Sequence, residues 1–221
     1  MAYDRPVAAE SNIARRRAAA RIDPRASYVE RRREIVCAAA TVFKERGFRG
    51  TTLAHIADAM GADRASLYYY VASKQELFRE IVSDAVRVNL ATATAIRDGG
   101  GDDADKLRRL MESLMRSYAE FYPVLYVLIQ ENFSHVDPER GEWAREMREL
   151  NLEYETVLTD VIASGQAAGI LRDRAPAWLI AHGVMGMFGW TNRWFNPNRS
   201  PLTADEVGRA FADLLLDGVR A

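Results

Sequence analysis

One stretch of the chain, TTLAHIADAMGADRASLYYYVASK at residues 51–74, constrains the fold more than any other. Its first half carries apolar residues at helical spacing, and Gly61 then allows a helix to end in a left-handed conformation without a side-chain clash. Asp63 is a favoured N-cap, and Leu67 and Val71 lie four residues apart on one face of the next helix. The stretch therefore predicts a helix-turn-helix, two short helices joined by a tight turn.

The residues outside this packed face indicate a nucleic-acid partner. In a helix-turn-helix the second helix lies in the major groove of DNA, and its first turn reaches base edges. Arg64 and Ser66 occupy that turn, whereas Thr52 and Lys74 are predicted to touch phosphates at the two flanks. The candidate DNA-binding residues are Thr52, Arg64, Ser66, Tyr68, Tyr69 and Lys74. The pattern alone leaves an alternative open, in which two helices and their tyrosines pack inside an ordinary all-α protein.

The run GFRGTTLAHIADAMGADRASLYYYVASKQELF carries a family resemblance. It resembles the DNA-binding domain of tetracycline-repressor-type (TetR family) regulators over about residues 27–82, with many positions in agreement at fixed spacing. The chain departs from that pattern at His55, where an acidic residue is usual, and at Asp63, where serine is more common. The resemblance implies a homodimer that binds a palindromic double-stranded DNA operator, acts as a repressor by default, and carries an effector-binding domain.

Charge is divided unevenly along a chain whose net charge is only −1. Residues 1–79 hold fifteen Lys or Arg against nine Asp or Glu, whereas residues 80–221 hold fifteen against twenty-two. A basic N-terminal part beside an acidic remainder is typical of a DNA-binding head on a separate body. We predict a flexible basic arm at residues 1–26, a DNA-binding domain at 27–82, and a ligand-binding and dimerisation domain at 83–221. The arm either stays a solvated tail or adds phosphate and minor-groove contacts.

The rest of the chain reads as helix, with no strand-like alternation of useful length. The predicted fold class is all-α, with an N-terminal three-helix head and a C-terminal helical ligand-binding and dimerisation bundle. A single cysteine, Cys37, fits a reducing compartment, and its alanine neighbours suggest a small buried thiol. No apolar run approaches the ~20 residues of a membrane span, and the N-terminus lacks a signal-peptide pattern. We therefore expect a cytoplasmic protein with no membrane partner.

The body is larger than dimerisation requires, and helical bundles hold ligands between facing helices. Its aromatic and methionine side chains are candidates for an adaptable ligand-binding wall, although ordinary core packing is an equally open interpretation. These candidates are Phe121, Tyr122, Tyr126, Phe133, Trp143, Met147, Met187, Trp190, Arg193 and Trp194. The arginine lies between two tryptophans and could pair with a carboxylate or phosphate. The C-terminal run resembles, more loosely, regulators of fatty-acid, acyl-CoA and sterol breakdown, which implies an acyl-CoA-like effector.

Glycines recur every third residue in the helix predicted at residues 176–195, at Gly183, Gly186 and Gly189. Glycine inside a helix costs ~1 kcal/mol relative to alanine, so three of them suggest close approach of another backbone or of a ligand. In the resembled family this helix and the last one form the dimer interface, although packing within one chain must use part of the same surface. The candidate interface residues are Gly183, Gly186, Phe211, Leu214 and Leu215.

Enzymatic function is not indicated by any motif. His55, His135 and His182 are scattered without metal-ligand spacing, and the chain has no GxSxG, HExxH or phosphate-binding glycine loop. We therefore predict no catalytic residues, no metal and no cofactor. The remaining alternative to a ligand-controlled regulator is an architectural DNA-binding protein that no effector regulates.

Overall fold

The computed structural model describes residues 24–130 and 141–219, which form helices and connecting loops without a strand. The all-α prediction is confirmed. Most of the predicted arm, together with Phe133 and His135, lies outside the described residues. None of the helices in the described ranges is both long and apolar enough to cross a membrane.

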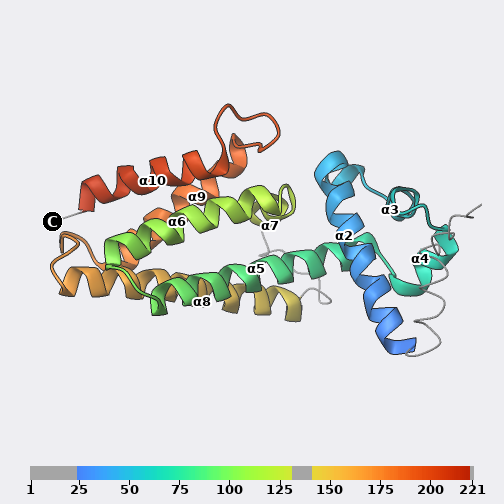
Figure 1. The fold of residues 1–221 in the computed structure, drawn as a ribbon, viewed down its shortest axis with the longest axis horizontal. Coiled ribbons are helices and arrows are strands. Elements are labelled where there is room, and N and C mark those ends of the chain that lie inside the picture. The colour runs from blue at the N-terminus through green and yellow to red at the C-terminus, as the bar shows by residue number, and fades with distance from the viewer. Residues whose placement is uncertain (1–23, 131–140, 220–221) are drawn as a thin grey trace, which may run out of the picture.

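Three helices form a head at one end of the molecule (Figure 1). They are α2 (Pro24–Gly50), α3 (Leu53–Ala59) and α4 (Arg64–Tyr70). Helix α2 is interrupted at Gly47, whose φ of 72° lies in the left-handed region that glycine adopts without strain. The sequence places apolar residues at helical spacing on all three helices, and their shared core contains Ile35, Ala39, Val42, Phe43, Ile56, Ala57 and Leu67.

Helix α5 (Lys74–Asp98) starts in the head and runs along the body (Figure 1). Ser73 caps its N-terminus by accepting a hydrogen bond from the Glu76 N–H at 3.1 Å. At its other end a Cβ on Gly99 would lie 2.9 Å from the Ala95 carbonyl oxygen, so glycine is required where the helix stops. One continuous helix therefore belongs to both parts of the molecule.

The body packs the remaining helices against α5. They are α6 (Asp103–Glu120), α7 (Val124–Gln130), α8 (Gly141–Ala167), α9 (Ala177–Trp190), the short 3-10 helix η2 (Thr191–Arg193) and α10 (Ala204–Val219). Helices α5 and α8 run side by side, α6 and α9 lie over them, and α10 covers α6 (Figure 1). The core of the body is formed by buried Leu, Ile, Val, Met and aromatic side chains of these helices.

Helices α6 and α10 approach each other closely at Gly208. A Cβ at this position would lie 3.0 Å from the Cα of Glu112 and 3.2 Å from the Cβ of Met115. Beside this contact, Arg116 of α6 donates a 2.9 Å hydrogen bond to Asp205 of α10. The close approach within the chain is thus made by a glycine of α10, whereas Cβ atoms at the three α9 glycines would meet no atom of residues 24–130 or 141–219 within 4 Å.

Cys37 lies on the exposed face of α2. The prediction of a buried thiol is wrong, because the alanines that follow Cys37 lie on other faces of the helix, and only Ala39 enters the core.

Candidate DNA-binding surface and effector pocket

Thr52 fixes the start of α3. Its hydroxyl accepts a hydrogen bond from the His55 N–H at 3.2 Å, and Nδ1 of His55 accepts one from the Thr52 N–H at 3.4 Å. This reciprocal pair is a capping box, in which an acidic side chain or glutamine usually takes the second role. His55 therefore supplies the same backbone contact as the acidic residue that it replaces.

The turn between α3 and α4 uses the two residues that the sequence marks for it. Gly61 has a φ of 59°, and Asp63 caps α4 by accepting a hydrogen bond from the Ser66 N–H at 3.3 Å. Leu67 and Val71 are 2% and 1% exposed and pack into the head core. These contacts confirm the predicted helix-turn-helix and set which face of α4 points outward.

The outward face of α4 carries the polar and aromatic side chains predicted to bind DNA. Arg64 and Ser66 are exposed, and Tyr68 and Tyr69 are 61% and 75% exposed. Of the three consecutive tyrosines, Tyr70 is the packed one; its ring lies 5.0 Å from that of Tyr28 on α2. Tyr69 touches the rings of Tyr28 and Tyr70 at its edge, but both Tyr68 and Tyr69 stay accessible to a partner instead of entering the core as the packing alternative would require.

Lys74 has a different environment from the phosphate contact expected of it. Its ammonium group donates to the carbonyl oxygens of Phe48 and Thr51, each at 2.8 Å, and lies 3.4 Å from that of Arg49. It also lies 4.7 Å from the centre of the Phe48 ring. An ammonium group has three donors, so these carbonyls account for all of them. Lys74 ties the loop before α3 to the start of α5, a role that sequence reasoning missed.

Arg32 joins three helices, its own α2, α4 and α5. Its guanidinium donates to the Tyr70 carbonyl at 2.6 Å, to Glu76 at 2.7 Å and to Glu80 at 2.6 Å. Burial by itself raises the pKa of Glu76, but hydrogen bonds from Arg32 and the Ala72 N–H, with the charge of Arg32, lower it overall. The end of α4 and the first turns of α5 are thus held by one side chain. Its only sequence signal is a pair of glutamates four residues apart.

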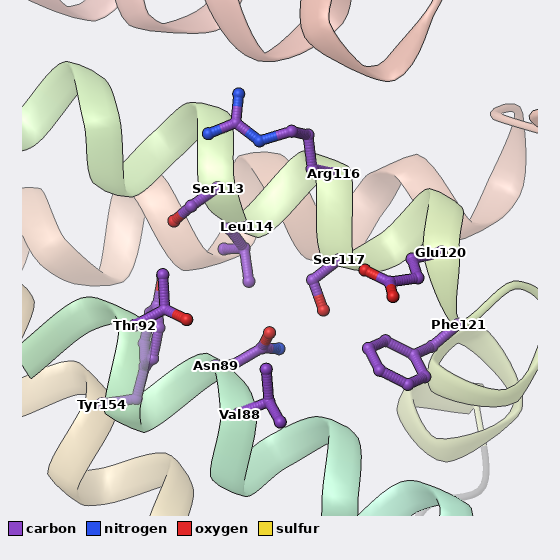
Figure 2. Close-up of a pocket in the computed structure, with 10 residues that line it drawn as sticks. All are labelled: Val88, Asn89, Thr92, Ser113, Leu114, Arg116, Ser117, Glu120, Phe121 and Tyr154. Carbon is purple, nitrogen blue, oxygen red and sulfur yellow. The ribbon is translucent and has the colours of Figure 1, made fainter. Parts of the chain in front are cut away.

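The body contains a pocket between α5, α6 and α8 with a volume of about 210 Å³ (Figure 2). It is lined by Val88, Asn89, Thr92, Ser113, Leu114, Arg116, Ser117, Glu120, Phe121 and Tyr154. Of the predicted ligand-binding residues that the structure describes, only Phe121 lines it. The polar lining residues carried no recognisable sequence signal, because hydroxyl and amide side chains are common on any exposed helix face.

Several predicted ligand-binding residues lie in the packed interior. Tyr126 is buried, which raises the pKa of its phenol to about 12, and its hydroxyl lies 2.8 Å from that of Thr191. The Thr191 hydroxyl donates to the Phe188 carbonyl, so Tyr126 is the donor of that contact. Tyr122 contacts the Tyr126 ring edge-to-face.

The aromatic and methionine candidates of α8 connect that helix to α5. The indole N–H of Trp143 donates to the Ser83 hydroxyl at 2.9 Å. Met147 is only 2% exposed, and its sulfur lies 3.9 Å from the same hydroxyl. These contacts give both residues a packing role at the α5–α8 joint, away from the pocket.

The remaining candidates lie at the end of α9 and in or directly after η2. Trp190 and Trp194 are 62% and 49% exposed, and the Arg193 guanidinium lies 5.2 Å from the centre of the Trp190 ring. Met187 is partly buried against the core. None of these four residues lines the pocket.

Helix α9 presents a largely apolar outer face, formed by Trp178, Leu179, Gly183, Gly186 and Trp190, with the exposed His182 among them. These residues recur at helical spacing and are exposed in the isolated chain. Gly183 and Gly186 are the predicted interface residues on this face. Of the other predicted interface residues, Leu214 is 68% exposed, whereas Phe211 packs against Phe188 and Trp194 and Leu215 is partly buried. The exposed outer face of α9 thus extends beyond the predicted interface, which included only its two glycines.

A helix-turn-helix with an outward recognition helix, attached to a helical body that holds a pocket, defines a DNA-binding transcriptional regulator. Residues 35–81 match the model "Bacterial regulatory proteins, tetR family", and residues 100–219 match "Tetracyclin repressor-like, C-terminal domain". The chain belongs to the TetR family of transcriptional regulators. The matched families and relatives are regulators and not enzymes.

Relatives support this assignment along most of the chain. The transcriptional repressor KstR2 of Mycobacterium tuberculosis is 26% identical over 189 residues, which cover 86% of this chain and 92% of KstR2, and its structure superposes with a TM-score of 0.72. The repressor NicS of Pseudomonas putida is 28% identical over 89% of this chain and 96% of its own. PfmR of Thermus thermophilus is 31% identical, with a TM-score of 0.71 over 83% of this chain and 97% of its own.

Proposed function

We propose that the protein is a homodimeric repressor that binds a palindromic operator in the cytoplasm and is released by a small hydrophobic or acyl-CoA-like effector. The observation that carries this proposal is the exposed face of α4, where Arg64, Ser66, Tyr68 and Tyr69 all point away from the head core. Residues 27–82 would form the DNA-binding domain, residues 83–221 would bind ligand and dimerise, and the arm at 1–26 would add phosphate contacts.

The side chains on this surface suggest a division of roles. Arg64 and Ser66 lie in the first turn of α4, the part of a recognition helix that meets base edges. Arg64 lies 3.7 Å from Asp58, with both side chains 63% exposed, so that weak pair can be exchanged for DNA. Thr52, Tyr68 and Tyr69 would contact phosphates, while Lys74 would act indirectly by holding the loop that carries Thr52.

Dimerisation would use the outer α9 face. Among the residues that the structure describes, none lies within 4 Å of a Cβ added at Gly183 or Gly186, so the described part of the chain does not explain two glycines in mid-helix. A second copy packed against this face would explain them and would cover the exposed Trp178 and Trp190. Two heads on one symmetric dimer would then read two half-sites of a palindrome.

Effector control would follow from linkage between the pocket and the head. Helix α5 contributes Val88, Asn89 and Thr92 to the pocket, and its first turns are bound to α2 and α4 through Arg32. A ligand that binds better when α5 is shifted would favour a conformer whose heads no longer match the operator spacing. Such a ligand lowers DNA affinity, which is the behaviour of a released repressor.

The volume of the pocket limits the size of the effector that it can hold. Pockets for drug-sized ligands are about 300–1,000 Å³, so a pocket of about 210 Å³ suits a short acyl group or a ligand of similar size. AibR, which shares this fold with a TM-score of 0.66 and 20% identity, was crystallised with isovaleryl coenzyme A and operator DNA. A short acyl group in the pocket, with its carrier outside, is the arrangement we propose.

Fluorescence anisotropy on the intergenic DNA beside the protein's own gene tests this function. We expect sequence-specific binding by a dimer, with reduced affinity in the presence of an effector from a panel of short acyl-CoAs and small hydrophobic compounds. Salt-dependent binding to any duplex, unaffected by the whole panel, would instead support an architectural DNA-binding protein.

A further inference from the structure

Two polar side chains face each other across the pocket. Ser117 comes from α6 and Asn89 from α5, and Figure 2 shows both pointing into the space between the two helices. The Ser117 residue is only 7% exposed, and its Oγ is buried without a hydrogen-bond partner among the described residues. Buried hydroxyls are almost always hydrogen-bonded, because an unmade bond is costly, so an unpartnered one at a pocket marks a place where a ligand completes it.

Ser113 provides an internal comparison. It lies one turn earlier on α6 and also lines the pocket, but its hydroxyl donates to the Leu110 carbonyl at 2.9 Å. A serine on this helix can therefore satisfy its hydroxyl from the helix backbone. Ser117 does not, so its donor remains available to a molecule in the pocket.

The charges around the pocket disfavour an anionic group. Among the ten described residues that line it, Arg116 is the only cation, and its Nη1 already lies 2.9 Å from Asp205 and 3.9 Å from Glu112. Glu120 adds a carboxylate to the lining (Figure 2). A second carboxylate entering this space would meet a like charge and a guanidinium that other carboxylates already neutralise.

We propose that this pocket recognises an uncharged carbonyl group through Ser117 and Asn89, and that it discriminates against the corresponding free acid. This inference rests on the proposed function, in which the pocket is the effector site. A carbonyl oxygen has two lone pairs, so it can accept from the Ser117 hydroxyl and the Asn89 amide at once. The apolar group next to the carbonyl packs against Leu114, Phe121 and Tyr154. Thioesters, ketones and amides meet these requirements.

The test is isothermal titration calorimetry on the full chain with matched probes. The probes are acyl-CoAs from acetyl to hexanoyl, the S-alkyl-CoA thioethers that lack the carbonyl oxygen, and the free acids. We expect a thioester to bind about tenfold or more tightly than its thioether and its acid, because the Ser117 hydroxyl that would donate to the carbonyl is itself buried. Ser117→Ala should weaken thioester binding about tenfold and leave thioether binding unchanged.

Two further variants test whether the loss of affinity is specific to the two proposed hydrogen-bond donors. Asn89→Ala should act in the same direction as Ser117→Ala, because it removes the second donor. Ser113→Ala is the matched control and should change affinity by less than about twofold, since its hydroxyl is already bonded to its own helix. Ser117→Ala removes an unpartnered hydroxyl, so its melting temperature should be equal to or above that of the wild type.

Carbonyl recognition is overturned if thioester and thioether bind equally, if the free acid binds as tightly, if Ser117→Ala has no effect, or if no thioester binds saturably. Operator binding, measured on the same preparation without any probe, judges the proposed function separately. A chain that binds thioesters with the expected preference but no operator would contradict the regulator and leave carbonyl recognition standing.

Discussion

Nη2 of Arg32 lies 2.6 Å from Oε2 of Glu80, and this ion pair joins α2 of the head to α5. The same guanidinium holds Glu76 and the Tyr70 carbonyl, so a single side chain connects the end of the recognition helix to the helix that enters the body. Removing its charge leaves two glutamates one turn apart without their shared cation.

Arg32→Gln should therefore lower stability by about 1–3 kcal/mol and also weaken operator binding, because α4 loses its anchor on α5. Urea unfolding and operator titration measure the two effects. Arg31→Gln is the control. Because Arg31 pairs with Glu34 on the same helix, this substitution should lower stability by only a few tenths of the amount expected for Arg32→Gln. Equal effects of the two variants would show that the connection between helices is unimportant.

The ionisation of Glu76 should make the stability of the head depend on pH. Its pKa is lower in the folded protein than its ordinary value of 4.5: burial raises the pKa, but the hydrogen bonds from Arg32 and the Ala72 N–H, together with the charge of Arg32, outweigh that effect. The stability that it contributes is complete above that ordinary value and is lost as pH falls through the lowered folded-state pKa. In Glu76→Gln, unfolding free energy should fall less between pH 6 and about pH 3 than in the wild type. Glu45→Gln, on an exposed site of α2, should retain the wild-type slope.

Substitutions of Arg64 and of Lys74 should impair DNA binding in different ways. Arg64→Ala is expected to cost about 1–3 kcal/mol on the operator and to relax preference at one base position, because a base-edge contact is lost. Lys74→Met should lower the melting temperature and weaken all DNA sequences alike, because the loop before α3 loses its three carbonyl contacts. Binding-site selection with each variant separates the two outcomes; a uniform loss from both would remove the assigned roles.

The outer α9 face can be tested without disturbing the monomer. Gly186→Glu has room for its Cβ and replaces a helix-breaking residue, so the helix should gain up to about 1 kcal/mol. The buried charge should nevertheless split a dimer formed through this face into monomers, as measured by sedimentation. Asn151→Glu on an exposed site of α8 is the control and should leave the assembly unchanged.

Gly208 should be intolerant of any side chain. Gly208→Val forces the backbone of α10 away from Glu112 Cα, which lies 3.0 Å from the position of a Cβ, and should destabilise the fold by about 1–3 kcal/mol. Gly218→Ala, later on the same helix, should have no such cost, because no described atom lies within 4 Å of the added Cβ. Thermal unfolding of the two variants compares them directly; similar melting temperatures would mean that α10 can move away without loss.

The helix-turn-helix of the head could be predicted from the sequence because the residues that define it interact locally. The caps at Thr52 and Asp63, the turn at Gly61 and the spacing of Leu67 and Val71 all act within one or two helical turns. The contacts of Arg32 could not be read in this way, since they join residues more than thirty positions apart. Lys74 was assigned to phosphate for the same reason, because the carbonyls it binds belong to a loop more than twenty residues earlier.

The pocket was largely missed because its position depends on which helices become neighbours. Aromatic and methionine side chains are the natural candidates for a ligand wall, but Tyr126 and Met147 fill the interior and Trp190 lies at the surface. The space that remains is lined instead by small polar residues such as Asn89 and Ser117, which composition alone cannot distinguish from solvent-facing positions. The apolar fraction of a body predicts a core more reliably than it predicts a cavity.

Because α5 is one continuous helix, a small rotation at its body end would displace its first turn in the head. From Asn89 at the pocket to Lys74 at its first turn, the helix rises about 22 Å at 1.5 Å per residue. A tilt of about 5° at the pocket would displace the far end by about 2 Å, in proportion to that length. In a two-headed molecule the displacements add across the symmetry axis, so the separation of the recognition helices would change by up to twice as much. Hydrogen bonds to base edges would be broken by a displacement of that size.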